Sequence, residues 1–344
     1  MRVGLIDFHT HFLPRSYPAL PAGITEPAWP RMVATGDHTA MMFIGEREFR
    51  SFDDLYWNPA QRVAALDRTG IDVQVMSPLP EILSYWLDAR AARVLTDAVN
   101  AAGAEMAAAA PTRLKCLGVA ALQDVPSAVQ QLEGFRAQGL VGVLVGSHVN
   151  GVSIADTRFD PFFAAAERLK LLVHVHGIKP AGLERMVGPG LMGAVLGIPH
   201  ENTMAVASLM MRDILGTFPQ LRLVFTHGGG GIGAVIDRMT HVWEKFPVMR
   251  ETLKVPPLDY ARRFHYDSAV FSPEYLGYLI RRLGASQLLA GSDGPTEIGQ
   301  TDLPGFVARA GVEGAALDAV LGGNAARLLG LAGLQECPSM QEPS

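Results

Sequence analysis

The run Ile6-Asp7-Phe8-His9-Thr10-His11 has the pattern of a buried strand that ends in two histidines. Three later apolar runs also end at a metal-ligand residue type: 171–174 and 223–227 end at a His, and 288–293 ends at an Asp. Imidazoles and carboxylates are the donors that many divalent metal ions bind in proteins. The carboxyl ends of parallel strands are where α/β barrels keep their active sites. Together the four runs predict a barrel with a metal site at one end.

Around these runs, short apolar segments alternate with longer amphipathic or Ala-rich segments. Strands are expected at residues 3–8, 71–76, 114–120, 140–145, 171–175, 221–225, 265–270 and 287–290. Helices are expected at residues 60–68, 89–109, 127–138, 161–170, 202–218, 233–245, 273–282 and 303–310. Because the strands are continuously apolar rather than alternating, they fit a parallel sheet covered on both faces. The order predicts an α/β fold, a (β/α)8 TIM barrel. An open, doubly wound sheet is the alternative, disfavoured because no GxGxxG follows an early strand.

The chain is expected to form a single barrel domain over residues 1–333. One stretch, about 12–57, interrupts the alternation just after the first strand and is rich in Pro near its start. A structureless loop of that length is improbable in a compact domain, so we predict an insertion of short strands over the barrel mouth. A second irregular segment, 177–200, is rich in Gly, Pro and Met. Residues 334–344 are expected to form a frayed C-terminal tail.

Composition limits the partners and the compartment. The 344 residues are 49% hydrophobic and 18% charged, with a net charge of −5. No Lys/Arg stripe suggests nucleic acid, and no apolar stretch of about 18 residues suggests a membrane span. The two cysteines, Cys116 and Cys337, form no CxxC pattern, and the N-terminus lacks the basic region of a signal peptide. A cytoplasmic protein is therefore expected.

His9 and His11 are two residues apart, so on a strand they face the same side and can bind one metal ion. The alternative is one structural and one incidental histidine. His174 ends the fifth predicted strand, and His176 stands in the same two-residue relation to it. His176 can therefore also face inward.

The sixth and eighth strands end in the remaining candidates. His227 opens the glycine run 228–231, which lets a backbone or a ligand approach closely. Asp293 lies within Gly291-Ser292-Asp293-Gly294-Pro295. A buried carboxylate without a partner is unfavourable, and a metal ion would compensate it. The alternative for Asp293 is a helix cap or a turn residue.

This order of ligand types resembles the amidohydrolase superfamily. Within it, the chain is similar to the branch of α-amino-β-carboxymuconate-ε-semialdehyde decarboxylase and related metal-dependent decarboxylases. The matching segments are IDFHTHFLP (6–14), DVQV (72–75), LVH (172–174), THGGG (226–230), DSAVF (267–271) and GSD (291–293). The resemblance extends from residue 6 to about residue 329.

The resemblance implies one Zn²⁺ per subunit, or another divalent metal, held by His9, His11, His174 and Asp293 together with a water molecule. His227 would then be the acid/base residue beside that water rather than a ligand. Imidazole suits this role because it titrates near neutral pH. Asp293 would share in catalysis as well as in metal binding.

The resemblance also implies that Arg50 and Arg238 hold substrate carboxylates. An arginine binds a carboxylate through two parallel hydrogen bonds, which suits an acidic small molecule. In this branch the second arginine comes from the neighbouring subunit, so a homodimer with a shared Arg238 is expected. Without the resemblance, both would be ordinary surface arginines.

Two places depart from the pattern of the relatives. An aromatic or bulky pair commonly follows the last aspartate, whereas here Gly294-Pro295-Thr296 follows. Relatives often carry Pro-Trp after the fifth-strand histidine, whereas this chain has Val175-His176-Gly177. Both places border the substrate, and His176 is accordingly a candidate substrate-binding residue. We expect an intact metal centre with an altered pocket.

The predicted function is zinc-dependent, non-oxidative decarboxylation of an unsaturated or aromatic carboxylic acid, a reaction of aromatic-compound catabolism. One alternative is a hydrolase or hydratase that acts on an amide, lactone or enol acid. A second alternative is a non-catalytic, metal-binding barrel that serves as an assembly partner.

Overall fold

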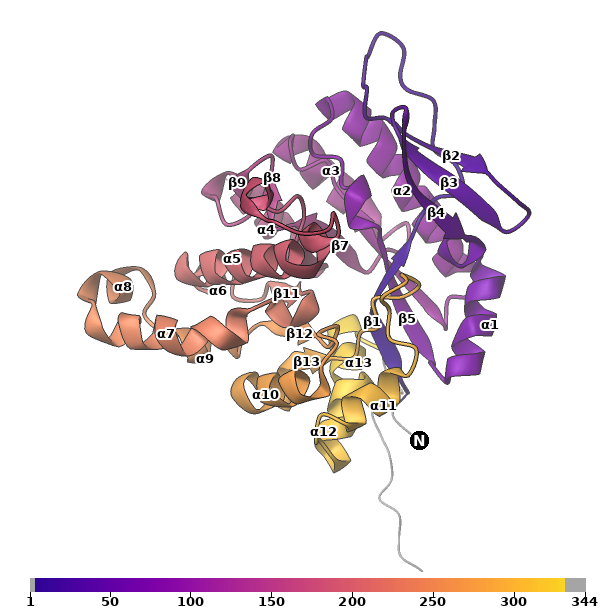
Figure 1. The fold of residues 1–344 in the computed structure, drawn as a ribbon. Coiled ribbons are helices and arrows are strands. Elements are labelled where there is room, and N and C mark those ends of the chain that lie inside the picture. The colour runs from indigo at the N-terminus through magenta and orange to yellow at the C-terminus, as the bar shows by residue number, and fades with distance from the viewer. Residues whose placement is uncertain (1–3, 332–344) are drawn as a thin grey trace, which may run out of the picture.

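Eight parallel strands form a nearly closed barrel in this computed structural model, which describes residues 4–331 (Figure 1). The strands are β1 (Ile6–Phe12), β5 (Val73–Pro78), β6 (Leu114–Val119), β7 (Gly142–Gly146), β10 (Leu172–His176), β11 (Arg222–Phe225), β12 (His265–Asp267) and β13 (Leu288–Leu289). Their spatial order follows their order in the sequence. The predicted (β/α)8 architecture is confirmed, while the expected tail at 334–344 and Cys337 lie outside the described residues.

The barrel closes where β1 meets the segment after β13. The Phe8 amide donates to the Ala290 carbonyl at 2.7 Å, and the Asp293 amide donates to the His9 carbonyl at 2.8 Å. The His11 amide donates to the Gly294 carbonyl, also at 2.8 Å. The first and last strands of the barrel therefore meet along a short seam that carries three of the predicted ligands.

Helices pack around the barrel and follow most of the predicted positions. They are α1 (Pro59–Thr69), α2 (Ala89–Ala109), α3 (Val125–Phe135), α4 (Asp160–Arg168), α5 (Ile198–Met211), α6 (Ile214–Thr217), α7 (Ile232–Lys245), α8 (Pro247–Thr252), α9 (Pro257–Ala261), α10 (Pro273–Leu283), α11 (Leu303–Ala308), α12 (Gly314–Asp318) and α13 (Asn324–Leu329). Asn58 caps α1 by accepting from the amides of Ala60 and Gln61, and Ser272 caps α10 by accepting from Tyr275. Both helices therefore begin with a polar cap and a proline at the first helical position.

The predicted insertion after β1 is an antiparallel sheet of three strands, β2 (Pro30–Ala34), β3 (Thr39–Ile44) and β4 (Arg47–Asp53). Met42 and Phe52 are buried in the main core, so the sheet packs against the barrel. A small hairpin of β8 (His148–Val149) and β9 (Val152–Ser153) follows β7.

The irregular segment after β10 carries an uncovered apolar surface. It contains a short π-helix, Gly193–Gly197, that leads into α5. Val187 is 97% exposed, Leu191 73% and Val195 66%. Apolar side chains exposed together in one segment often mark a surface that another molecule covers.

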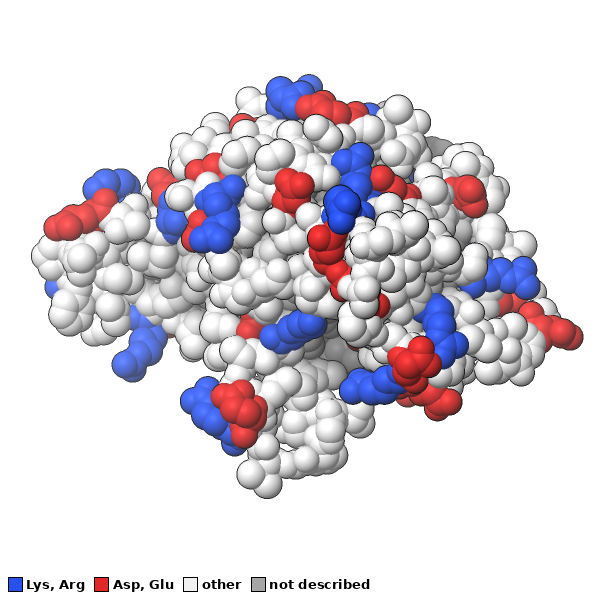
Figure 2. Space-filling model, turned by 90° about the horizontal axis from the view of Figure 1, so that it is seen from above, with Lys and Arg blue, Asp and Glu red and all other residues white. Residues whose placement is uncertain are grey.

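Charged side chains are spread in small mixed groups on the face seen from above. Figure 2 shows acidic and basic side chains beside one another, separated by wide uncharged areas. Among the described residues, no helix combines the length and the apolar character needed to cross a membrane.

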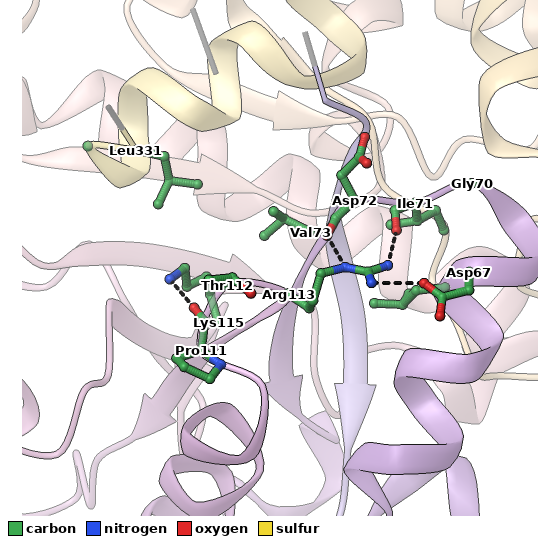
Figure 3. Close-up of a pocket in the computed structure, with 12 residues that line it drawn as sticks. Asp67, Gly70, Ile71, Asp72, Val73, Pro111, Thr112, Arg113, Lys115 and Leu331 are labelled. Carbon is green, nitrogen blue, oxygen red and sulfur yellow. Dashed lines mark hydrogen bonds and ion pairs between the residues drawn. The ribbon is translucent and has the colours of Figure 1, made fainter. Parts of the chain in front are cut away.

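A hollow of about 710 Å³ lies beside the amino ends of β5 and β6 (Figure 3). The Arg113 guanidinium at its wall donates to the carbonyls of Ile71 and Asp72 and pairs with Asp67 at 2.8 Å. Because this arginine is fully engaged and the amino ends of barrel strands carry stability rather than catalysis, the hollow is not the candidate site.

Candidate metal centre

Three predicted ligands converge across the barrel seam. β1 runs to Phe12, so His9 and His11 both lie within the strand and face the same side. Their Nε2 atoms are 3.2 Å apart. Asp293 Oδ1 lies 3.1 Å from His11 Nε2 and 3.6 Å from His9 Nε2. All three side chains are buried.

A second group joins the first through His9. One donor atom each of His9, His176 and His227 lies within 4.8 Å of the others. The ring centroid of His176 is 5.5 Å from that of His9, 5.7 Å from that of His11 and 5.2 Å from that of His227. Four imidazoles and one carboxylate therefore form two groups of possible ligands that share His9 at the carboxyl ends of the strands.

Three of these four imidazoles are hydrogen-bonded through Nδ1, and the Nδ1 of His9 is in ion-pair contact with Asp267. The Nδ1 contacts are His9 with Asp267 Oδ2 (2.7 Å), His11 with Ser77 Oγ (3.3 Å), His176 with the Gly177 carbonyl (2.8 Å) and His227 with the Ala269 carbonyl (3.1 Å). Carbonyl and carboxylate oxygens only accept, and Ser77 Oγ donates to the Thr10 carbonyl, so Nδ1 is the donor in each case. The lone pairs are left on the four Nε2 atoms.

The structure does not bring His174 into this group. β10 ends at His176, so His174 lies two residues deeper in the barrel. Its Nε2 is 3.8 Å from Asp267 Oδ2, and neither of its ring nitrogens has a hydrogen-bond partner. Burial lowers the pKa of His174 to about 4, which keeps the ring neutral. His174 thus lies on the Nδ1 side of His9, whereas the cluster lies on the Nε2 side.

The cluster fits a divalent cation. With Nδ1 as the donor, the Nε2 lone pairs of His9 and His11 face each other at 3.2 Å, which is repulsive unless a positive charge lies between them. Two ligands at about 2.1 Å from one tetrahedral ion stand about 3.4 Å apart, close to the separations seen here. Burial alone would lower the pKa of His9, but the charges of Asp267 and Asp293 outweigh it and raise the pKa to about 9. The surroundings therefore favour a cation.

Two of these residues have left-handed backbone conformations. Asp293 has φ 64° and His227 has φ 53°. Such values cost a non-glycine residue about 1–3 kcal/mol and are concentrated at functional sites. The turn after His227 needs glycine, because a Cβ at Gly230 (φ 67°) would overlap the Pro199 carbonyl.

The two predicted arginines lie on different parts of the surface. Arg50 is exposed on β4, with its guanidinium 5.3 Å from the ring centre of Phe49. Burial raises the pKa of the buried Tyr56 phenol. The positive charge of Arg50 lowers this pKa and the negative charge of Asp293 raises it, so both residues act on the same side chain. Arg238 is exposed on α7 and forms no ion pair with any residue in 4–331.

Asp267 and Ser77 were not predicted as site residues. Asp267 ends β12, so the strand-end pattern that indicated His227 and Asp293 could have found it. Ser77 carries no such signal, because a serine near a strand end is common.

Comparison with known proteins agrees with the geometry. The amidohydrolase family model matches residues 6–331. The 2-amino-3-carboxymuconate-6-semialdehyde decarboxylase of Dictyostelium discoideum is 31% identical over 330 residues, which cover 95% of this chain and 91% of that protein. The structure of 5-carboxyvanillate decarboxylase from Sphingomonas paucimobilis matches with a TM-score of 0.72 and 28% identity, covering 78% of this chain and 82% of that one. IDCase from Metarhizium anisopliae shares the fold, with a TM-score of 0.80 at 22% identity over 96% of this chain and 98% of that one.

Proposed function

The chain belongs to the amidohydrolase family and is a carboxy-lyase of that family, and we propose that it removes carbon dioxide non-oxidatively from an unsaturated or aromatic carboxylic acid. The relatives support both substrate types, since one is named for a carboxymuconate semialdehyde and another for carboxyvanillate. The observation that carries the proposal is the pair of buried ligand groups, His9/His11/Asp293 and His9/His176/His227, at the carboxyl ends of the strands.

We propose Zn²⁺ as the metal, one ion per chain, held by His9, His11, His176 and Asp293. On β10 we favour His176 over the predicted ligand His174, because His176 Nδ1 is bonded to the Gly177 carbonyl and a ring nitrogen of His176 lies within 4.8 Å of donor atoms of His9 and His227. His174 then becomes a neutral residue that packs beneath the site. A divalent ion held by these residues would supply Lewis acidity.

His227 is proposed as the proton carrier. Loss of carbon dioxide leaves an electron pair on the substrate carbon, and that carbon must then take up a proton. Burial lowers the pKa of His227, so its Nε2 is free to accept a proton near neutral pH. The bond from Nδ1 to the Ala269 carbonyl fixes the ring while Nε2 takes up or releases that proton.

Arg50 and Arg238 are proposed to bind substrate carboxylates in a homodimer. Arg238 is exposed and unpaired among the described residues, which suits a side chain that acts in a neighbouring subunit. The exposed apolar surface around Val187, Leu191 and Val195 supplies area that a second subunit could cover. Because charges are mixed on the face in Figure 2, local arginines would have to attract an acidic substrate. The buried free thiol of Cys116 fits a cytoplasmic location.

The test is a substrate screen with the zinc-loaded protein. Carboxylated muconate semialdehydes and hydroxybenzoates are offered singly, and released carbon dioxide and the change in absorbance are recorded together. Stoichiometric carbon dioxide, with an organic product lighter than the substrate by CO₂ and no net addition of water, is the expected result. Net addition of water to the product mass without carbon dioxide would instead identify a hydrolase or hydratase and reject the proposal. The His227→Ala protein is the control for non-enzymatic decay of the substrates.

A further inference from the structure

A chain of buried polar side chains runs beneath the metal centre, from α1 through β5 and β1 to the segment after β13. Arg62 Nε donates to Gln74 Oε1 at 2.6 Å, and Gln74 Nε2 donates to Asp7 Oδ2 at 3.1 Å. Asp7 also accepts from the Ser292 amide at 2.9 Å and from Ser292 Oγ at 2.7 Å. All four side chains are at most 6% exposed.

The direction of these hydrogen bonds is fixed. A guanidinium only donates and a carboxylate only accepts. The amide of Gln74 therefore has a single workable orientation, with its oxygen toward Arg62 and its nitrogen toward Asp7. A neutral amide thus joins the buried guanidinium of Arg62 to the buried carboxyl of Asp7, whose pKa is raised by burial and lowered by the hydrogen bonds from Ser292 and Gln74.

Both ends of this chain reach proposed metal ligands. At one end, Arg62 Nη2 donates to the carbonyl of His11 at 2.8 Å. At the other end, Ser292 is adjacent to Asp293, and both of its donors are held by Asp7. The hydroxyl of Ser292 also accepts from the Gly294 amide at 3.0 Å, which fixes the backbone on the far side of Asp293. His11 and Asp293 lie on opposite sides of the barrel seam, and the hydrogen-bonded side chains from Arg62 to Ser292 cross that seam.

Stability alone does not account for this arrangement. Burying a charge without an opposite charge in contact is unfavourable, and apolar side chains of similar size often do as well or better. Burial lowers the pKa of Arg62 to about 10, so the guanidinium still carries its charge at neutral pH. What the polar chain supplies, and apolar packing cannot, is a directional hold on one carbonyl and one amide.

We infer that Arg62, Gln74, Asp7 and Ser292 are positioning residues that set the separation of His11 and Asp293 for metal binding. The inference rests on the proposed metal centre. None of the four residues need touch the metal or the substrate. Residues that orient metal ligands in this manner typically change metal affinity by 10–100-fold when they are replaced.

The test exchanges donor and acceptor between the side chains at residues 7 and 74. Gln74→Glu sets a carboxylate against Asp7, and Asp7→Asn sets an amide nitrogen against that of Gln74. The double variant restores a workable order, because an amide at residue 7 can donate to a carboxylate at residue 74, which still accepts from Arg62. Zinc affinity of each purified, metal-stripped protein is measured by competition with a chromophoric chelator. We expect each single variant to bind zinc about 10–100-fold more weakly and the double variant to bind more tightly than either, because it restores the contact between residues 7 and 74.

A matched control comes from Gln131, which is buried on α3 and donates to Thr96 and to Asp97 at 2.7 Å each. Gln131→Glu makes the same change beside another carboxylate, away from the seam. It should lower the melting temperature and leave zinc affinity unchanged. Ser292→Ala removes only a hydroxyl and serves if Gln74→Glu does not fold; it too should weaken zinc binding.

Three results would overturn the inference. If the single variants bind zinc as tightly as the wild type, the four hydrogen-bonded residues contribute only to stability. A double variant weaker than either single variant would contradict the directional account. If the wild-type protein binds no zinc at all, the proposed metal centre itself fails, and this outcome is distinct from the other two.

Discussion

His9 Nδ1 lies 2.7 Å from Asp267 Oδ2, and both side chains are completely buried. The contact joins the first barrel strand to the seventh, at the floor of the histidine cluster. A carboxylate behind a ligating imidazole fixes the ring and makes its other nitrogen a better donor. Asp267 therefore acts on a metal ion through His9.

Asp267→Asn keeps the shape of this side chain and removes its charge. We expect zinc affinity to fall by about 10–100-fold, measured by chelator competition. Asp259→Asn is the control, since Asp259 is exposed on α9 and pairs with Arg262. Equal affinity of both variants would show that Asp267 does not support the ligand.

His174 and His176 offer a matched pair of changes on one strand. His176→Leu should abolish stoichiometric zinc, because it removes a donor from the cluster. His174→Leu should retain zinc, since neither ring nitrogen of His174 forms a hydrogen bond and Asp267 Oδ2 lies 3.8 Å from its Nε2. Metal per chain is measured by elemental analysis after dialysis. The opposite outcome would return the ligand role to His174.

His227→Ala should retain zinc and lose turnover by about 10²–10⁴-fold, the usual contribution of an acid/base group. The measurement pairs elemental analysis with kcat on the substrate found by the screen. Loss of zinc in this variant would make His227 a ligand instead.

Arg50→Ala and Arg238→Ala test whether the site is shared between subunits. Each variant alone should be nearly inactive, because one carboxylate contact is lost. After the two are unfolded and refolded together at equal amounts, about a quarter of wild-type activity should return, since half the dimers are mixed and each has one intact site. Failure to complement would place both arginines outside a shared site.

His265 gives a pH dependence that is separate from the metal. Burial and the charge of Arg327 together lower its pKa from 6.5 to about 4. Between these values the unfolded chain binds more protons, so stability falls as the pH drops from about 6.5 toward 4, by about 1.4 kcal/mol per unit at most. His265→Gln should therefore lose less stability across this window, measured by urea unfolding of metal-stripped protein. Parallel stability curves for wild type and variant would contradict this account.

The barrel and most of its helices could be predicted because each signal is local. Continuous apolar runs mark buried parallel strands, and Asn58 and Ser272 mark helix starts. The Asp160-Pro161 pair shows the limit of such signals. The helix begins at Asp160 after the cap residue Phe159, and the carboxylate of Asp160 instead pairs with Arg212.

The choice between His174 and His176 could not be made from the sequence, because both lie on the same face of one strand. Depth in the barrel depends on pairing with neighbouring strands, and His176 is level with Gly146, the last residue of β7. The chain from Arg62 to Ser292 was equally hidden. It depends on side-chain directions from four separate segments, which no spacing in the sequence encodes.

The seam between β1 and the segment after β13 has a consequence for how the molecule folds. His11 and Asp293 are 282 residues apart in the chain, yet their side chains meet. A metal ion bound to both would cross-link the first barrel strand to the segment after the last one, and so hold the barrel closed. Closing so long a loop costs conformational entropy, so a metal ion that links the two ends of the barrel would contribute to the stability of the folded state. Chemistry and the closure of the barrel would then depend on the same atoms.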